Sequence, residues 1–389
     1  MTDVFILSAV RTAIGGFGGS LSGFAPIDLA SHVAKEAIAR SGVEAGQIGA
    51  AVFGHVINTE PRDMYLSRVA AMNAGVPEGT PAMNVNRLCG SGAQAIVSAA
   101  QALMLGDAEM ALAGGAECMS RAPYVLQAAR FGQKMGDTKA IDMMTGALTC
   151  PFGTGHMGIT AENVAAERGV TRADQDAFAL ESQSRAARAI VEGRFASQIV
   201  PIEIASRKGA VSFAVDEHPK ATTADALAGL KPAFQKDGTV TAGNASGIND
   251  GAAALVLARG DALGGKAPRA RIMGYAVAGV APRVMGLGPV PAVEKLCAKL
   301  GLKPADFDVV ESNEAFAAQA IAVNRALGLD PARVNPDGGA VALGHPVGAT
   351  GSILIVKALH ELERSGGKTA LVTMCIGGGQ GIALAIERV

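Results

Sequence analysis

Cys89 lies in the segment Asn86-Arg-Leu-Cys-Gly-Ser-Gly-Ala, which is followed at once by an amphipathic helix. A cysteine at a helix N-terminus lies near the positive end of the helix dipole and near unpaired main-chain N–H groups. Both features favour the thiolate, so we expect the pKa of Cys89 to lie below its ordinary value of about 8.5. The segment therefore predicts a nucleophile, and a buried structural cysteine at a turn is the alternative.

A histidine stands in a second glycine-bounded segment, Gly344-His-Pro-Val-Gly-Ala-Thr-Gly. A side chain between a glycine and a proline is poorly placed to pack inside a helix or a strand. A neutral imidazole at His345 would be able to take the proton of Cys89 or to donate to a developing oxyanion.

A second cysteine opens the segment Cys375-Ile-Gly-Gly-Gly-Gln-Gly, directly after an apolar run that ends near Met374. The glycines would expose main-chain N–H groups that can bind an oxyanion. A second thiol would also supply the base that removes a proton from the α-carbon of a thioester. Taken alone, the segment is more typical of a glycine turn with an incidental thiol.

The fourth segment, Ser312-Asn-Glu-Ala-Phe-Ala, follows an expected strand at residues 308–311. Ligands of open α/β sheets bind at the carboxyl ends of the strands, so these polar groups are candidates for a binding site. Asn313 is suited to holding a water molecule or a donor. Capping of the following helix is the alternative role for Ser312 or Asn313.

These segments follow an internal repeat in the chain. Gly42 and Gly301 end similar helices and stand 259 positions apart, and Gly92 and Gly351 stand at the same spacing. Expected helices at residues 93–105 and 352–363 follow the second pair, and each is followed by a glycine and an apolar strand. Strands that alternate with helices favour sheets with helices on both faces.

The same spacing aligns Cys89 with Gly348, three residues beyond His345, so we expect the two loops to face one another. The fold class is α/β, with two duplicated βα halves whose mixed, mostly parallel sheets pack as layers. The halves are residues 1–118, completed by about 242–267, and residues 268–389. Residues 119–241 form an inserted loop domain that we expect to shape a binding site or an oligomer contact.

Composition argues against several classes of protein. The chain has 34 Lys+Arg against 35 Asp+Glu, no Trp and 4% aromatics, so nucleic-acid binding has little support. We expect no membrane span and no leader peptide, and hence a cytoplasmic protein with five reduced cysteines. Cys297 lies on an apolar helix face and is expected in the core, and no cysteine pair has the spacing of a zinc site.

The four segments, found together and in this order, resemble the thiolase family along essentially the whole chain. Two further matches are the early Val10-Arg-Thr-Ala-Ile-Gly and the middle Thr241-Ala-Gly-Asn-Ala-Ser-Gly-Ile-Asn-Asp-Gly. The closest resemblance is to bacterial short-chain β-ketothiolases and acetyl-CoA acetyltransferases. It implies reversible Claisen condensation of acetyl-CoA with an acyl-CoA, or thiolysis of a 3-ketoacyl-CoA, by a ping-pong mechanism.

The resemblance also implies the role of each catalytic residue. Cys89 is the acylated nucleophile, and His345 activates it and helps to stabilise the thioester oxyanion with a water held by Asn313. Cys375 moves a proton to and from the α-carbon of acetyl-CoA. The main-chain N–H groups of Cys89 and Gly377 would form a second oxyanion hole.

The inserted domain should carry the coenzyme A site by the same resemblance. The matching positions are Ser246, Ala245, His156, Met157, Phe234, Phe316 and Lys220. Lys220 stands where many relatives have an arginine, and Arg87 stands where some acetoacetyl-specific members have a glutamine.

The family further implies a homotetramer of the dimer-of-dimers type, with residues 119–157 as the tetramer contact. No metal or bound cofactor is implied, and coenzyme A thioesters of fatty acid or polyhydroxyalkanoate metabolism are the expected substrates. Two alternatives remain: a 3-ketoacyl synthase, which would replace the second cysteine with histidine or asparagine, and a catalytically inactive carrier of coenzyme A esters or lipids.

Overall fold

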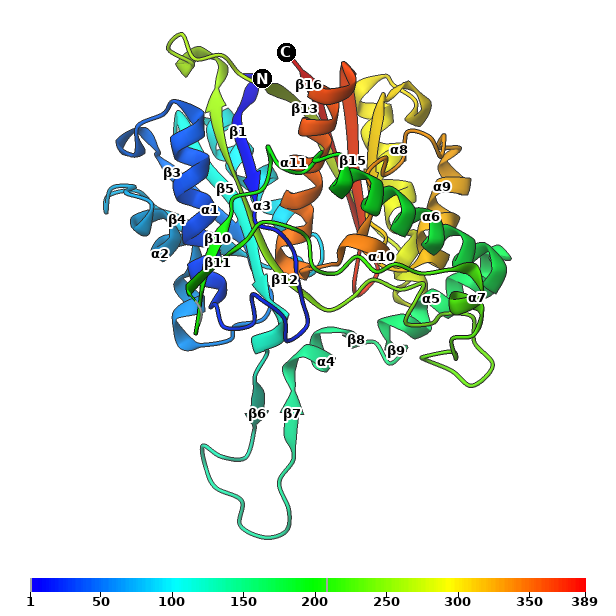
Figure 1. Ribbon diagram of the computed structural model, residues 1–389. Helices are drawn as coiled ribbons and strands as arrows, with labels where there is room; N and C mark the ends of the chain where they lie inside the picture. Colours follow the sequence, from blue (N-terminus) through cyan, green and yellow to red (C-terminus); the bar gives the residue numbers. More distant parts are fainter. Residues whose placement is uncertain (1, 208) are drawn as a thin grey trace.

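One ten-stranded sheet runs through the computed structural model, which describes residues 2–207 and 209–389 (Figure 1). The strand order is β14-β15-β16-β13-β1-β12-β5-β3-β4, and the short β2 pairs with β12. The strands are β1 (Val4–Arg11), β2 (Gly15–Gly16), β3 (Ala50–Gly54), β4 (Ala82–Val85), β5 (Met110–Cys118), β12 (Asn249–Arg259), β13 (Ala270–Gly279), β14 (Val309–Ser312), β15 (Thr369–Ile376) and β16 (Gln380–Arg388).

The sheet is mixed, as predicted, but its parallel pairs lie only toward the two ends. β3 pairs in parallel with β4 and β5, and β14 pairs in parallel with β15, whereas the central pairs are antiparallel. Parallel pairing is therefore less extensive than expected. The reason is that the strands which begin or close the two halves are antiparallel to their neighbours. These strands are β1, β12, β13 and β16.

Helices pack on both sides of the sheet, in the layers that the repeat predicts. α1 (Pro26–Ser41) contacts β1, β5 and β12, and α8 (Pro289–Leu300) contacts β13, β15 and β16. Between the two halves, α3 (Ser91–Leu105) packs against α11 (Val347–Ser365), and α11 also contacts strands of both halves (Figure 1). The remaining helices of the halves are α2 (Leu66–Asn73), α9 (Ala317–Leu327) and α10 (Ala340–Leu343).

The two glycines of the repeat lie where α3 and α11 cross. A Cβ atom on Gly92 would come within 2.7 Å of the Ser352 nitrogen, and one on Gly351 would come within 2.3 Å of the Ala93 nitrogen. Only glycine permits this approach, which brings the N-termini of both helices together. α11 begins at Val347, earlier than predicted from the glycines, because here glycine marks a helix contact inside the first turns.

The inserted domain wraps around this body and carries its own short elements. It contains β6 (Tyr124–Leu126), β7 (Ala140–Asp142), α4 (Met143–Ala147), β8 (Thr149–Cys150), β9 (Gly155–His156), α5 (Met157–Arg168), α6 (Arg172–Val191), β10 (Ile202–Ser206), β11 (Gly209–Phe213) and α7 (Ala224–Ala228). A buried ion pair ties it to the sheet, because Arg11 donates to both carboxylate oxygens of Asp216 at 2.7 and 3.0 Å. Its β6–β7 arm projects away from the body (Figure 1).

Among the described residues, one helical segment, Leu88–Leu105, is long and apolar enough to cross a membrane. Helix α3 makes up most of this segment. This corrects the expectation that no apolar run reaches that length. Length and composition are weak support for a span, because the core helix of a globular protein passes the same test. Here α3 packs against α11 and strands of the sheet, and 56% of the segment is buried inside the protein.

Candidate active site

A cavity of about 260 Å³ opens between the N-termini of α3 and α11, the turn after β15 and the inserted domain. Cys89, His345 and Cys375, which come from three separate segments, all line it. The structure thus brings together the two glycine-bounded loops that the repeat placed face to face. The other lining residues are Met119, Leu148, His156, Met157, Phe234, Ala245, Ser246, Gly247, Ile248, Met285, Ala315, Phe316, Val347 and Gly377.

Cys89 is held on a sharp turn two residues before α3. The preceding Leu88 has a φ of 47°, a left-handed conformation that is unfavourable for a residue with a side chain. Two hydrogen bonds fix it there: the Leu88 N–H donates to Asn86 Oδ1 at 3.0 Å, and Ser91 Oγ donates to the Leu88 carbonyl at 2.6 Å. Backbone strain that is held by several contacts in this way is typical of functional positions.

The pKa of the Cys89 thiol is raised, not lowered as the sequence predicted. Burial in the cavity is the largest cause, and the nearby carboxylate of Glu117 adds to it. Two main-chain N–H groups, those of Gly377 and of Cys89 itself, hydrogen-bond the sulfur and act in the opposite direction. Desolvation therefore outweighs these N–H groups, and Cys89 stays a thiol until a base takes its proton.

The backbone of His345 is fixed from two sides. Its N–H donates to Asn249 Oδ1 at 2.9 Å. Gly344 has a φ of 101°, and a Cβ atom there would lie 2.4 Å from the Asn249 side chain, so only glycine fits this position.

The ring of His345 has a defined tautomer. Its Nδ1 lies 2.7 Å from Thr350 Oγ1, and that hydroxyl donates its only proton to the Pro346 carbonyl at 2.9 Å. Both hydrogen bonds can form together only if Nδ1 carries a proton and donates to Thr350. The lone pair is then on Nε2, which is the atom available to act as a base.

Burial also lowers the pKa of His345 to about 4, so the ring is neutral near pH 7. In the unfolded chain a histidine takes up its proton near pH 6.5, so between about pH 4 and pH 6.5 the unfolded state binds more protons. The free energy of unfolding should therefore decrease as the pH is lowered through this window, and His345 alone should account for at most about 3 kcal/mol. Urea unfolding at pH 7 and pH 5 tests this expectation.

A His345→Gln variant provides the comparison, because it should show a shallower pH dependence than the wild type. His360, whose pKa burial also lowers to about 4, should contribute equally to both proteins. Equal pH dependence in the two proteins would contradict the assignment of a buried neutral ring at His345.

Asn313 lies behind the histidine and does not line the main cavity. It follows β14, is 1% exposed, and its Nδ2 is 3.5 Å from Nε2 of His345. Its Oδ1 has no hydrogen-bond partner among the described residues. An unpaired buried carbonyl oxygen is unfavourable, so this position suits a bound water molecule.

Cys375 is fully buried at the end of β15, and burial raises the pKa of its thiol, with Cys89 as a further cause. Gly377, two residues later, places its N–H on the sulfur of Cys89. The third segment therefore contributes a second thiol and a main-chain N–H donor to the same cavity.

Three aromatic rings line the cavity, His156 and Phe234 from the inserted domain and Phe316 from the C-terminal half. His156 stacks on Phe234 with ring centroids 4.8 Å apart, and Phe234 meets Phe316 edge to face at 6.1 Å. A Cβ atom on Gly158 would lie 2.3 Å from the Phe234 ring, so the first turn of α5 packs directly against it. Met157 adds an apolar side chain to this wall.

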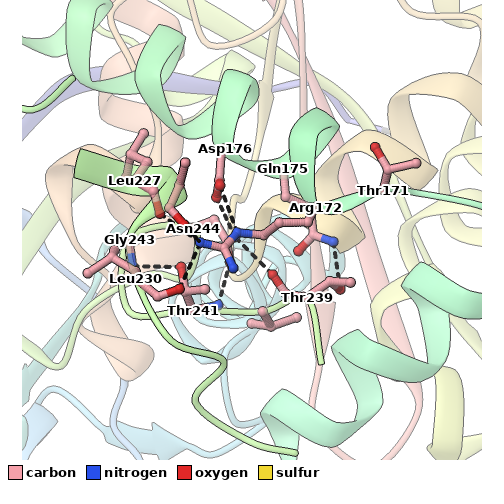
Figure 2. Close-up of polar contacts among 12 residues, drawn as sticks. Thr171, Arg172, Gln175, Asp176, Leu227, Leu230, Thr239, Thr241, Gly243 and Asn244 are labelled. Carbon is pink, nitrogen blue, oxygen red and sulfur yellow. Dashed lines mark hydrogen bonds and ion pairs between the residues drawn. The ribbon is translucent and has the colours of Figure 1, made fainter. Parts of the chain in front are cut away.

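A polar network positions the loop that carries Ala245 and Ser246 (Figure 2). Asn244 donates to Asp176 Oδ1 at 2.9 Å and accepts from the Thr241 N–H at 2.8 Å. Arg172 in turn donates to Asp176 Oδ2 at 2.7 Å and to main-chain carbonyls beside α7. The loop is thus anchored to α6, and Ser246 Oγ donates to the Ala315 carbonyl at 2.9 Å.

Lys220 is the one predicted coenzyme A position on the surface, away from the cavity lining. Its main-chain N–H donates to Gln183 Oε1 at 3.0 Å, and its side chain is exposed. Two residues before Lys220, His218 lies against the cavity-lining Gly247, where a Cβ atom would be 2.2 Å from the imidazole ring.

Several residues at the site were not predicted. Asn249 and Thr350, which orient His345, lie within segments that the sequence analysis singled out, so their hydrogen-bonding side chains were an available signal. The apolar lining residues Met119, Leu148 and Met285 carry no such signal, because apolar residues at these positions look like ordinary core. Among the described residues, no group of three or more His, Cys, Asp or Glu side chains is placed to hold a metal ion.

Two family models match nearly the whole chain. Residues 4–261 match the model of the thiolase N-terminal domain, and residues 266–388 match that of the thiolase C-terminal domain.

The most similar proteins include the β-ketothiolase BktB of Cupriavidus necator, which is 58% identical over 100% of this chain and 99% of its own length. The acetyl-CoA acetyltransferase of Pseudomonas aeruginosa is 50% identical over the full length of both chains. Among solved structures, human mitochondrial 3-ketoacyl-CoA thiolase in complex with CoA matches with a TM-score of 0.97 and 44% identity, covering 100% of this chain and 98% of that chain.

Proposed function

Because this chain belongs to the thiolase family, we propose that it is a β-ketothiolase, an acetyl-CoA C-acyltransferase that carries its acyl group on Cys89. The enzyme joins acetyl-CoA to an acyl-CoA by Claisen condensation, or cleaves a 3-ketoacyl-CoA with free CoA. The observation that carries the proposal is the meeting of Cys89, His345 and Cys375 in one cavity.

In the first half-reaction, the Cys89 sulfur attacks the acyl carbonyl while its proton moves to Nε2 of His345. The coenzyme A sulfur leaves and takes the proton of Cys375. The products are acyl-Cys89, an imidazolium at His345 and a thiolate at Cys375, so charge is conserved. The high proton affinity of Cys375 makes this thiolate a strong base.

In the second half-reaction, the Cys375 thiolate removes an α-proton from acetyl-CoA, and the carbanion attacks acyl-Cys89. The Cys89 sulfur leaves and recovers its proton from His345, which restores the starting state. The N–H groups of Cys89 and Gly377 would bind the oxygen of the acyl-Cys89 carbonyl, and the loss of one such donor typically costs about 3 kcal/mol. His345 and a water on Asn313 would bind the thioester oxygen of acetyl-CoA.

The acyl group itself would extend from Cys89 into a smaller adjoining cavity. That cavity is lined by Val56, Leu88, Cys89, Met119, Ala147, Leu148, Met157, Val347 and Gly377, none of which is charged. An uncharged aliphatic acyl group suits this lining, because a buried carboxylate without a partner is strongly unfavourable. The pantetheine chain would enter past Ser246, Ala245, His156 and Phe316, with Lys220 nearer the nucleotide.

The direct test is thiolysis of acetoacetyl-CoA by free CoA with the purified protein. Turnover with acetoacetyl-CoA, and much slower turnover with a 3-ketoacyl-CoA that ends in a carboxylate, would support the proposal. Binding of coenzyme A esters without turnover on short or longer 3-ketoacyl-CoA would instead favour a carrier. A 3-ketoacyl synthase is disfavoured because Cys375 keeps the second thiol that such enzymes lack.

We also propose a homotetramer in which the β6–β7 arm forms the contact between dimers. The arm exposes large apolar side chains, with Phe131 93% and Met135 87% accessible in the single chain. Exposed apolar side chains on a projecting hairpin suit a contact with another chain. The edge strand β4 contains the exposed Met83 and lies near the exposed Tyr65, and its free edge suits the contact within a dimer.

A Phe131→Ser, Met135→Ser double variant should therefore sediment as a dimer where the wild type sediments as a tetramer. Sedimentation velocity measures both species, and thiolysis activity reports whether the body remains folded. A double variant that stays tetrameric would contradict the role of the arm.

The cytoplasm is the proposed compartment, supported by five cysteines that are all free. The pathway we propose is fatty acid or polyhydroxyalkanoate metabolism, since the relatives are named as β-ketothiolase and acetyl-CoA acetyltransferase.

A further inference from the structure

A buried carboxylate next to the reactive cysteine has no role in the mechanism above. Glu117 lies near the end of β5 and is 0% exposed. Its oxygens accept hydrogen bonds from three main-chain N–H groups, those of Val56 at 3.0 Å, Ile57 at 3.1 Å and Gly348 at 3.0 Å. Because all three are donors, they favour the ionised carboxylate, which can only accept.

His55 lies on the other side of this carboxylate and continues the buried network. Its Nδ1 is 3.4 Å from Glu117 Oε1 and 3.0 Å from the Ala116 carbonyl, and its Nε2 is 4.0 Å from Asp63 Oδ2. The side chains of Glu117 and Asp63 are 0% exposed and that of His55 is 2% exposed. The pKa of Glu117 is raised above its ordinary value, because burial outweighs the opposing effects of His55 and the three N–H groups.

The bonds of Glu117 connect the two halves of the chain at the acyl cavity. Val56, whose N–H it binds, lines that cavity beside Cys89. Val347 also lines it, and Gly348, the next residue and part of the first turn of α11, donates to the same carboxylate oxygen. A Cβ atom on Gly348 would come within 2.4 Å of that oxygen, so the close contact requires glycine.

We propose that Glu117 is a positioning residue: its buried carboxylate ties the loop at residues 55–57 to the first turn of α11 and so fixes the walls of the acyl cavity around Cys89. The inference rests on the proposed acyl transfer and adds a residue to it. Because α11 begins two residues after His345, the same tie holds the base at a fixed distance from the nucleophile. The negative charge also opposes loss of the Cys89 proton in the free enzyme, and removal of that charge can be measured on the cysteine itself.

The variant Glu117→Gln keeps the shape of the side chain but removes its charge and turns one acceptor into a donor. A donor facing main-chain N–H groups breaks at least one of the three hydrogen bonds. We expect kcat for thiolysis to fall by about 10²-fold, as for misplacement of reacting groups by about 1 Å. The KM for CoA should change little, because the hydrogen bonds of Glu117 go to residues 56, 57 and 348 and not to the wall around Ser246.

Alkylation of Cys89 by iodoacetamide gives a second readout that an ordinary stability defect would not move. Three titratable groups line the cavity with Cys89, namely His156, His345 and Cys375, and Glu117 acts on Cys89 through its charge. The Glu117→Gln substitution directly removes the charge of Glu117 alone. The pH midpoint of alkylation should therefore shift to lower pH in Glu117→Gln. Peptide mass spectrometry assigns the alkylated residue, so the other four cysteines do not obscure the result.

Glu162→Gln is the matched control. Glu162 is also a buried carboxylate that accepts main-chain N–H bonds, from Thr239 at 2.9 Å and Val240 at 2.8 Å, but it belongs to α5. This control should leave the alkylation midpoint of Cys89 unchanged. Glu117→Asp is a further variant that keeps the charge but is too short to reach all three N–H groups, so it should lower kcat without shifting the midpoint.

The outcomes separate this inference from the proposed function. A wild type without turnover would contradict the proposed function, whereas the alkylation midpoint of Glu117→Gln would still test the charge at Cys89. Folded Glu117→Gln with kcat within about threefold of the wild type, or with an unshifted midpoint, would overturn the inference. If Glu117→Gln does not fold, a wild-type kcat in Glu117→Asp would overturn it in the same way.

Discussion

Replacing Cys89 with serine should lower kcat for acetoacetyl-CoA thiolysis by roughly 10³-fold or more. The serine hydroxyl holds its proton more tightly than a thiol, and a neutral His345 in a buried site is a weak base for it. Coenzyme A esters should still bind, because the stacked wall of His156 and Phe234 is unchanged. Steady-state thiolysis, together with mass spectrometry of the enzyme after incubation with acetyl-CoA, measures turnover and acylation separately.

Cys297→Ser is the control for this experiment. It makes the same chemical change at a buried thiol, but Cys297 lies on α8 in a core cluster with Val293 and Leu296, as the sequence predicted. Its turnover should match the wild type, even if the new hydroxyl lowers stability. Acylation of the Cys89→Ser protein at the wild-type rate would show that the acyl group is carried elsewhere.

The sequence predicted which segments meet at the site because each is bounded by glycines that serve a geometric purpose. Gly92 and Gly351 allow α3 and α11 to cross closely, and Gly344 takes a left-handed backbone that turns His345 toward the cavity. The positions of these glycines in the sequence therefore indicate where the backbone must approach closely or turn. The common offset of the two halves then placed the loop of Cys89 opposite that of His345.

The direction of the Cys89 pKa was predicted wrongly for a physical reason. The expectation used only the local helix N-terminus, which favours the thiolate. Burial depends on side chains that are distant in the sequence, such as Leu148 and Met285, and no local pattern reveals that they line the cavity of Cys89. The effect of Glu117 on the Cys89 pKa was missed for the same reason. Glu117 is distant from Cys89 in the sequence, and the packing of β5 against α3 and α11 brings the two residues near one another.

The observed start of α11 shows that glycine does not reliably mark the end of a helix. The sequence placed the start of this helix after Gly351, because glycine weakens a helix interior. The helix includes both Gly348 and Gly351, since contacts with Glu117 and with α3 leave no room for a side chain at either position. The start of α11 is therefore set by tertiary contacts, which cannot be read from the glycine spacing of one segment.

Replacing Cys375 with serine should lower kcat for thiolysis by about 10³-fold, within the range of 10²–10⁴ for loss of a general acid or base. The reason is that the same sulfur must protonate the α-carbon of departing acetyl-CoA and, in the other direction, remove that proton. Exchange of the α-protons of acetyl-CoA with deuterium from solvent isolates this step. The exchange should be nearly lost in Cys375→Ser, whereas acylation of Cys89 should be reduced less.

The ratio of these two rates distinguishes a base from a supporting residue. Cys375 is fully buried and its pKa is raised partly by Cys89, so a structural role through Cys89 would reduce acylation and exchange together. A proton-transfer role reduces exchange more strongly, because acylation also has His345 to accept the nucleophile's proton. Equal losses in both rates would therefore contradict the assignment of Cys375 as the α-carbon base, even if overall thiolysis were abolished.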